Sequence, residues 1–331
     1  MKKTALLFLV LACLPSIAAA EVSGAVVNRT TGEPQAGATV TLYKFGQGGM
    51  EPVASAKTDA AGAFSIAQDV AAGGQGPSMV RVEIDNVTYN HMMPPGTPTT
   101  GIAFDVYNAS KRQPAEVKVS RHMILFQPGG GEMKVNETFL VNNTGKITWF
   151  DPAAGTLPFY LPASAAGKVE ISAIAPNGMS VPVPYARTAR ADTYATKFEI
   201  KPGETRIDMI YAVPYTEGAA YAGRVATKDE NTYLIAPRGV TLEAQGLQDL
   251  GPEPRTGTHI YGLSTASYSV KLTGTAVFDA PADDSSAQQE SGPQIEQIMP
   301  RIYSRASLIL GLALGILALG FALLYRAQGN R

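Results

Sequence analysis

The sequence predicts an all-β protein that is carried on a single membrane-spanning helix, and three observations lead to this expectation. From residue 21 to residue 278, short runs of alternating apolar and polar residues are separated by Gly, Pro, Asn or Asp about every ten residues. Such spacing is typical of antiparallel β-sandwiches rather than of alternating strands and helices. The chain also begins with a short apolar leader and ends with an uncharged apolar run.

The leader, residues 1–20, has the pattern of a secretory signal peptide. Lys2 and Lys3 form a basic start, a short apolar run follows, and Ala18 and Ala20 supply the small residues of a cleavage site before position 21. The apolar part is too short to span a bilayer. A second interpretation stays open, because the residues around Cys13 loosely resemble a bacterial lipoprotein box in which that cysteine would be lipidated.

The C-terminal run, residues 306–325, predicts a transmembrane helix, since twenty helical residues span about 30 Å, the thickness of the bilayer core. The leader would orient it with residues 326–331 in the cytoplasm. We therefore expect a single-pass protein of the bacterial inner membrane with its body in the periplasm. Gly311 and Gly315 form a small-residue motif that lets two helices approach closely, so lateral helix association is a further possibility.

Composition narrows the class of partner. The formal net charge of −1 gives no reason to expect a nucleic-acid partner. Cys13 is the single cysteine and lies in the leader, so the exported chain would carry no disulfide.

Residues 21–108 predict the first β-sandwich. Two strands flank a turn-rich stretch, and a further turn, Asp59-Ala60-Ala61-Gly62, leads into Phe64 and Ile66, which alternate inward. We expect a positive φ at Gly62, which would leave Phe64 in register to fill the core.

This region resembles the carboxypeptidase regulatory-like domain, a transthyretin-like sandwich of bacterial envelope proteins. The likeness is carried by Gly24, Val26, Thr31, Gly32, Glu33, Pro34, Ala36, Gly37, Ala38, Val40, Leu42, Thr58, Asp59, Gly62 and Phe64. The resemblance implies a fold that serves as a spacer, a binding module or an enzyme appendage, so it fixes no function by itself.

Residues 109–278 predict a second β-sandwich region that is broadly immunoglobulin-like; whether it is one domain or two stays open. Within it, the turn Pro202-Gly203-Glu204 predicts a hairpin of two long adjacent strands. Residues 279–305 form a polar, acidic stretch, which predicts a disordered stalk that holds the β-domains off the membrane.

No pattern in the chain predicts catalysis, a metal or a cofactor. The histidines, His91, His122 and His259, are far apart, and none has the Glu or His spacing of a zinc site. His122 reads as a surface or half-buried residue with no partner in view. We expect a protein that is not an enzyme.

One aromatic cluster suggests recognition. Trp149, Phe150, Phe159 and Tyr160 flank a loop rich in Pro and Gly, and flat rings stack on sugars or on apolar protein surfaces. Recognition would need at least two of these rings to face solvent; otherwise the loop folds back over its own sandwich. The expected function is a noncatalytic, membrane-anchored periplasmic interaction protein, such as an accessory subunit of an inner-membrane complex. The alternative is an anchored carbohydrate-binding module.

Overall fold

The computed structural model describes residues 21–46, 49–68, 76–165, 167–227, 231–274 and 276. The predicted leader, stalk, anchor and tail, and with them Gly311 and Gly315, lie outside the described residues. Within this part the protein is all-β, as expected, with its strands arranged in several packed sheets. No helix in the described ranges is long and apolar enough to cross a membrane.

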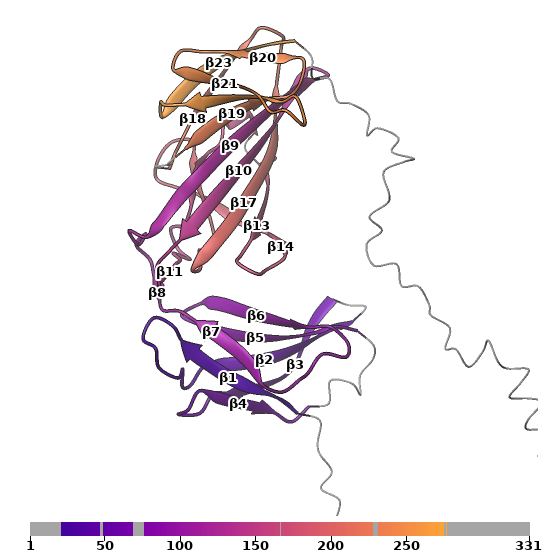
Figure 1. The fold of residues 1–331 in the computed structure, drawn as a ribbon, viewed down its shortest axis with the longest axis vertical. Coiled ribbons are helices and arrows are strands. Elements are labelled where there is room, and N and C mark those ends of the chain that lie inside the picture. The colour runs from indigo at the N-terminus through magenta and orange to yellow at the C-terminus, as the bar shows by residue number, and fades with distance from the viewer. Residues whose placement is uncertain are drawn as a thin grey trace, which may run out of the picture. The chain divides into compact units, whose positions relative to one another are not determined.

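The first seven strands form two facing sheets (Figure 1). One has the order β4-β1-β7 and the other β3-β2-β5-β6. Their bounds are β1 Val22–Asn28, β2 Thr39–Gly46, β3 Gly49–Lys57, β4 Ala63–Ile66, β5 Ser78–Ile84, β6 Val87–Met93 and β7 Ile102–Val106. The inward residues of both sheets form one buried cluster that runs from Val22 to Val106.

The β3–β4 turn is built as its sequence predicts. Gly62 has φ +73°, and its N–H donates to the Asp59 carbonyl at 3.0 Å. The Asp59 carboxylate accepts hydrogen bonds from the N–H groups of Ala61 and Ala63, each at 2.9 Å. The turn brings Phe64 into the cluster with 4% of its surface exposed, while Val40 and Leu42 are completely buried.

The remaining strands enclose a second, larger cluster that runs from Val117 to Leu272. They are β8 Ala109–Ser110, β9 Val117–Gly129, β10 Glu132–Asn143, β11 Thr148–Trp149, β12 Pro158–Tyr160, β13 Glu170–Ile174, β14 Ser180–Pro182, β15 Tyr185–Arg187, β16 Thr193–Thr196, β17 Gly203–Pro214, β18 Ala220–Arg224, β19 Thr232–Ala236, β20 Val240–Glu243, β21 Leu247–Pro252, β22 His259–Leu263 and β23 Ser267–Gly274. A 3-10 turn, η2 (Ala163–Ala165), lies between β12 and β13.

An eight-stranded sheet with the order β14-β13-β17-β10-β9-β19-β22-β21 dominates this part. Its long central strands β9, β10 and β17 lie side by side in Figure 1. Smaller sheets, β18-β23-β20 and β12-β16-β15, contribute the other inward residues of the cluster. At the β9–β10 hairpin, Gly130 and Gly131 have φ values of +61° and +83°, as a two-residue turn between twisted strands requires.

The hairpin predicted around Gly203 is wrong. β17 begins at Gly203, but its two neighbours are β10 and β13, and the segment before the turn does not pair with it. That segment pairs instead with Trp149: the Trp149 N–H donates to the Ile200 carbonyl at 3.0 Å, and the Ile200 N–H donates back at 2.9 Å. Because both edges of β17 are occupied, the preceding residues turn into the core, where Phe198 and Ile200 are buried.

Candidate functional site

The structure divides the four rings of the predicted recognition loop. Trp149 and Phe159 are buried, with 6% and 1% of their surfaces exposed, whereas Phe150 and Tyr160 are half-buried. Phe159 stacks against Tyr194 at 5.9 Å between ring centres. The four rings therefore do not gather on one exposed face. Recognition by this loop would need two rings in solvent, and only Phe150 and Tyr160 are partly accessible.

The loop that joins these rings is locally ordered. The Asp151 carboxylate accepts hydrogen bonds from the N–H groups of Ala153 at 2.9 Å and Ala154 at 3.0 Å. These bonds, the one from Ala154 foremost, hold the pKa of the Asp151 carboxyl below its usual range. Gly155 has φ +85°, and a Cβ there would lie 2.5 Å from the Ala195 Cβ, so the loop closes tightly over β16. This closure directs the chain back toward the core at Leu157.

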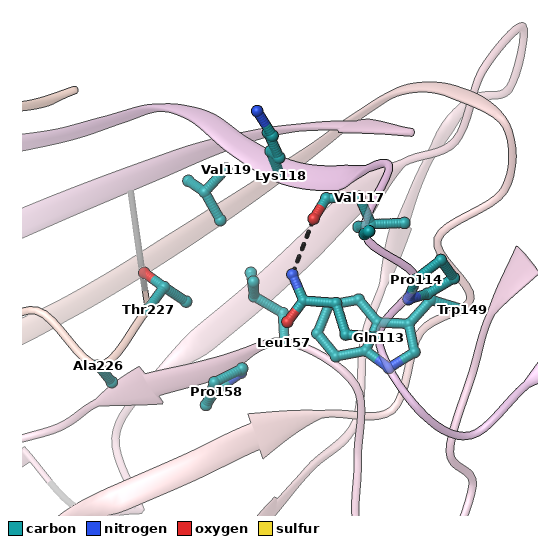
Figure 2. Close-up of a pocket in the computed structure, with 11 residues that line it drawn as sticks. Gln113, Pro114, Val117, Lys118, Val119, Trp149, Leu157, Pro158, Ala226 and Thr227 are labelled. Carbon is teal, nitrogen blue, oxygen red and sulfur yellow. Dashed lines mark hydrogen bonds between the residues drawn. The ribbon is translucent and has the colours of Figure 1, made fainter. Parts of the chain in front are cut away.

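Trp149 nevertheless reaches a pocket of about 540 Å³ (Figure 2). Three segments far apart in the sequence form its walls: the connection leading into β9, the β11–β12 region, and the residues after β18. The lining residues are mainly apolar: Gln113, Pro114, Ala115, Val117, Lys118, Val119, Trp149, Leu157, Pro158, Ala226 and Thr227. A concave site with an indole and two prolines in its wall suits a ligand with a flat or apolar face.

The lining contains two polar groups, the Gln113 amide and the Thr227 hydroxyl. The Gln113 side-chain amide donates to the Val117 carbonyl at 2.9 Å, which fixes the amide plane and leaves its carbonyl oxygen able to accept a hydrogen bond (Figure 2). The Thr227 hydroxyl is shielded from solvent and has no hydrogen-bond partner within the described residues. A buried hydroxyl without a partner is unfavourable, and a ligand that paired with it would remove that penalty. In Figure 2 the Lys118 ammonium points away from the indole.

A second cluster of polar groups lies inside the core of the larger sandwich. His122 Nε2 lies 3.2 Å from Glu137 Oε2, and the Tyr211 hydroxyl donates to Glu137 Oε1 at 2.6 Å. The Tyr221 hydroxyl is 2.9 Å from that of Tyr211, so the chain of contacts runs from β9 through β10 and β17 to β18. His122 also stacks on Phe139, with ring centres 4.0 Å apart.

This network corrects the interpretation of His122 as a surface or half-buried histidine without a partner. His122 is 2% exposed and Glu137 is 5% exposed. The sequence did hold a signal, because Glu137 alternates in phase with Met133, Val135, Phe139 and Val141 and therefore shares their inward face. Because the four side chains of the network are buried, we treat it as a structural element rather than as the site.

Titratable residues elsewhere do not assemble into a metal site. No group of three or more His, Cys, Asp or Glu side chains with metal-binding geometry occurs within the part of the chain that the structure describes. A surface pair of this kind, His259 Nε2 and Asp249 Oδ1 at 2.5 Å, belongs to the β21–β22 ladder. The pocket at Trp149 is therefore the site whose geometry best fits recognition.

Comparison with known proteins adds no relative: no protein-family model matches this chain, and no curated protein matches it.

Proposed function

We propose that the protein is a noncatalytic, membrane-anchored binding protein of the bacterial envelope whose pocket at Trp149 holds an apolar side chain of a protein partner. The pocket carries the proposal, because it places the single tryptophan of the chain in a concave, largely apolar wall with two polar groups at defined positions. A partner side chain buried in such a pocket is the usual anchor of a protein interface.

The chemistry of the lining supports binding rather than catalysis. None of the described residues that line the pocket is a Ser, Cys, His, Asp or Glu. Lys118 is the one charged residue among them, and its ammonium is directed away from the indole (Figure 2). In the described part of this wall, no nucleophile has a neighbouring base, the arrangement that group transfer requires.

The proposed architecture follows from the two ends of the chain and from the first sandwich. Residues 1–20 would direct export, residues 306–325 would anchor the protein in the inner membrane, and residues 279–305 would tether the β-domains in the periplasm. We assign residues 21–108 to the carboxypeptidase regulatory-like, transthyretin-like sandwiches. The positive φ of Gly62 and the burial of Phe64, Val40 and Leu42 support this assignment. The immunoglobulin-like character of residues 109–278 is the corresponding proposal for the second region.

Site-specific photo-crosslinking in intact cells tests the proposed function. A benzophenone amino acid replaces Gln113, which is exposed at the pocket rim, and the matched control carries it at Ser55, which is exposed on β3. We expect position 113 to form an adduct with an inner-membrane or periplasmic protein, and we expect Ala226→Phe, which fills the pocket, to abolish it. Equal adducts at both positions, or an adduct that survives Ala226→Phe, would exclude the pocket as the partner site.

A glycan is the second candidate ligand. The combination that favours it is an indole beside the Gln113 amide and the unpartnered Thr227 hydroxyl, since sugars offer both an apolar face and hydroxyl groups. Maltohexaose is a suitable probe for the detergent-solubilised protein, and the fluorescence of Trp149 is the readout. A saturable shift that Ala226→Phe removes would favour the glycan, whereas no shift together with a protein adduct at position 113 would favour the protein partner.

A further inference from the structure

The outer face of the eight-stranded sheet carries an apolar ridge. One row of side chains crosses six strands in register: Ile260, Ile235, Leu125, Asn136, Ile210 and Glu170. The first three of these are apolar and half-buried, and Met123 and Tyr233 stand beside them in the next row. Leu250, at the bulge of β21, extends the ridge with 48% of its surface exposed.

These side chains point away from the protein core. Their strands alternate at these positions, with His122, Ile124 and Phe126 of β9 and Thr232, Leu234 and Ala236 of β19 facing inward. The ridge residues belong to neither buried cluster, nor to the partly buried residues that pack against those clusters. A contiguous apolar surface of this kind on a soluble domain usually marks an interaction site.

The other half of the same face is hollow. A depression of about 500 Å³ lies over β13, β14 and β17. Its lining is largely apolar but includes two carboxylates and two serines: Val169, Glu170, Ile171, Ser172, Ser180, Pro182, Val183, Asp208 and Ile210. Ile210 is 37% exposed, so the hollow presents apolar surface to solvent. The face thus bears a ridge on the β9–β19–β22 side and a largely apolar hollow on the β14–β13–β17 side, with β10 between them.

Several of the polar residues between ridge and hollow have partners within the sheet. Asn136 donates to the Gln127 side chain at 2.8 Å, and the Thr138 hydroxyl donates to Asp208 at 2.7 Å. Arg206 pairs with Asp208 at 2.8 Å. Covering these groups would leave few unmet hydrogen bonds, which is the main penalty for burying polar surface.

We infer that this face packs against the same face of a second copy of the chain, the ridge of each copy seated in the hollow of the other. A two-fold axis near the β10–β17 pair exchanges ridge and hollow, which is the self-complementarity that an isologous interface requires. Two sheets packed face to face lie about 10 Å apart.

The area available sets the strength of this dimer. Six strands about 4.8 Å apart, each contributing about 20 Å of length, give roughly 600 Å² per copy, or about 1,200 Å² in total. That total lies at the lower limit for stable interfaces, so we expect the dimer to dissociate in dilute solution. Two copies tethered in one membrane meet at a high effective concentration, which populates such a dimer without further contacts.

Cysteine cross-linking of the full chain in native membranes tests the inference. Cys13 is the single natural cysteine and lies in the leader, so a cysteine introduced at Asn136, close to the axis, reports only on contacts between chains. We expect Asn136→Cys, treated with a short bis-maleimide, to give a product of twice the chain mass, and Ser55→Cys, on an exposed strand of the other sandwich, to give none.

Second-site variants assign the contact. Leu125→Glu or Ile260→Lys on the ridge should reduce the cross-linked dimer at least tenfold, while Ser55→Glu should leave it unchanged; unchanged Trp149 emission shows that each variant is folded. Gly315→Leu, which alters the small-residue motif of the anchor, should leave most of the dimer. The inference is overturned if Asn136→Cys links to a protein of another mass or to nothing. It is equally overturned if folded ridge variants keep the dimer, or if Gly315→Leu alone removes it.

Discussion

Trp149 and Phe150 are neighbours in the chain, yet their rings pack into different cores. Trp149 belongs to the buried cluster of the larger sandwich, and Phe150 packs against the cluster of the first. Backbone hydrogen bonds join the two sandwiches at this dipeptide. The Phe150 N–H donates to the Ser110 carbonyl at 2.9 Å, and β11 pairs with β8. This dipeptide therefore couples the wall of the candidate pocket to the first sandwich.

Other contacts reinforce the junction. The Thr88 hydroxyl of β6 donates to Glu199 at 3.1 Å, and Lys201 lies over the Tyr89 ring at 5.0 Å. Burial lowers the pKa of Lys201, whereas its salt bridge with Glu199, at 3.3 Å, acts in the opposite direction. The Tyr89 hydroxyl lies 3.4 Å from that of Thr148.

Phe150→Ala should loosen this junction. Because the ring is half-buried, we expect a loss of about 2 kcal/mol, roughly half of the effect of removing a fully buried Phe. Limited proteolysis measures the result: trypsin should cut faster after Lys111 or Arg112, which are exposed in the connection between the sandwiches. Ile147→Ala, at a side chain that is 38% exposed, is the matched control and should leave the rate unchanged. Equal rates for both variants would mean that Phe150 does not hold the junction.

Glu137→Met should destabilise the larger sandwich by about 3–5 kcal/mol, because it removes the acceptor of both His122 and Tyr211 inside the core. Adding His122→Leu should recover part of this loss, since an apolar pair of similar volume can replace a buried polar pair. Thermal unfolding of the detergent-solubilised protein, followed by Trp149 fluorescence, measures both effects in the same sandwich. Additive losses in the double variant would contradict a coupled network.

The protein should lose stability above about pH 10. Burial raises the pKa of Tyr211, Tyr221 and Tyr268, and the charge of Glu137 acts in the same direction. The folded state therefore keeps protons that the unfolded state releases, so their contribution is complete below the ordinary tyrosine pKa and is lost as the pH rises above it. Between its unfolded and folded pKa values, each such tyrosine lowers the free energy of unfolding by about 1.4 kcal/mol per pH unit.

Denaturation measured between pH 9 and pH 11, together with tyrosinate absorbance, tests this slope. Tyr268→Phe is the matched control, because it removes one phenol hydroxyl and keeps the aromatic ring, whose centre lies 6.4 Å from the centre of the Tyr221 ring. The variant should show a shallower decline than the natural chain. Identical declines would show that Tyr268 does not retain its proton in the folded state.

Gly62→Ala should cost more stability than Gly32→Ala, although both glycines have positive φ values, +73° and +85°. A Cβ at Gly62 would lie 2.5 Å from the Val26 carbonyl oxygen, whereas a Cβ at Gly32 would meet nothing within 4 Å. We expect about 1 kcal/mol for Gly32→Ala from backbone strain alone, and about 2–3 kcal/mol for Gly62→Ala. Thermal unfolding followed by far-UV circular dichroism compares the two variants. Equal decreases in melting temperature would contradict the close approach of position 62 to Val26.

The sequence by itself determined the strands and several of their turns. Period-two alternation needs only neighbouring residues, so β9, β10 and β17 could be read from their patterns. The turn at Gly62 could be read in the same way, because a glycine at the end of a turn follows from local backbone sterics. The uncharged run at residues 306–325 predicts an anchor for a similar reason, since its length and composition are local properties.

Only the tertiary structure decided which strands become neighbours and which rings are covered. β9 pairs with β19 in parallel across more than a hundred residues of sequence, and no local pattern specifies such a partner. The hairpin predicted at Gly203 failed because β10 and β13 occupy the edges of β17. Trp149 reads as a loop aromatic until the core of the larger sandwich packs around it. The His122–Glu137 pair exists only once β9 and β10 are in register. Burial and pairing are set by the free energy of the whole packed structure, which local periodicity does not contain.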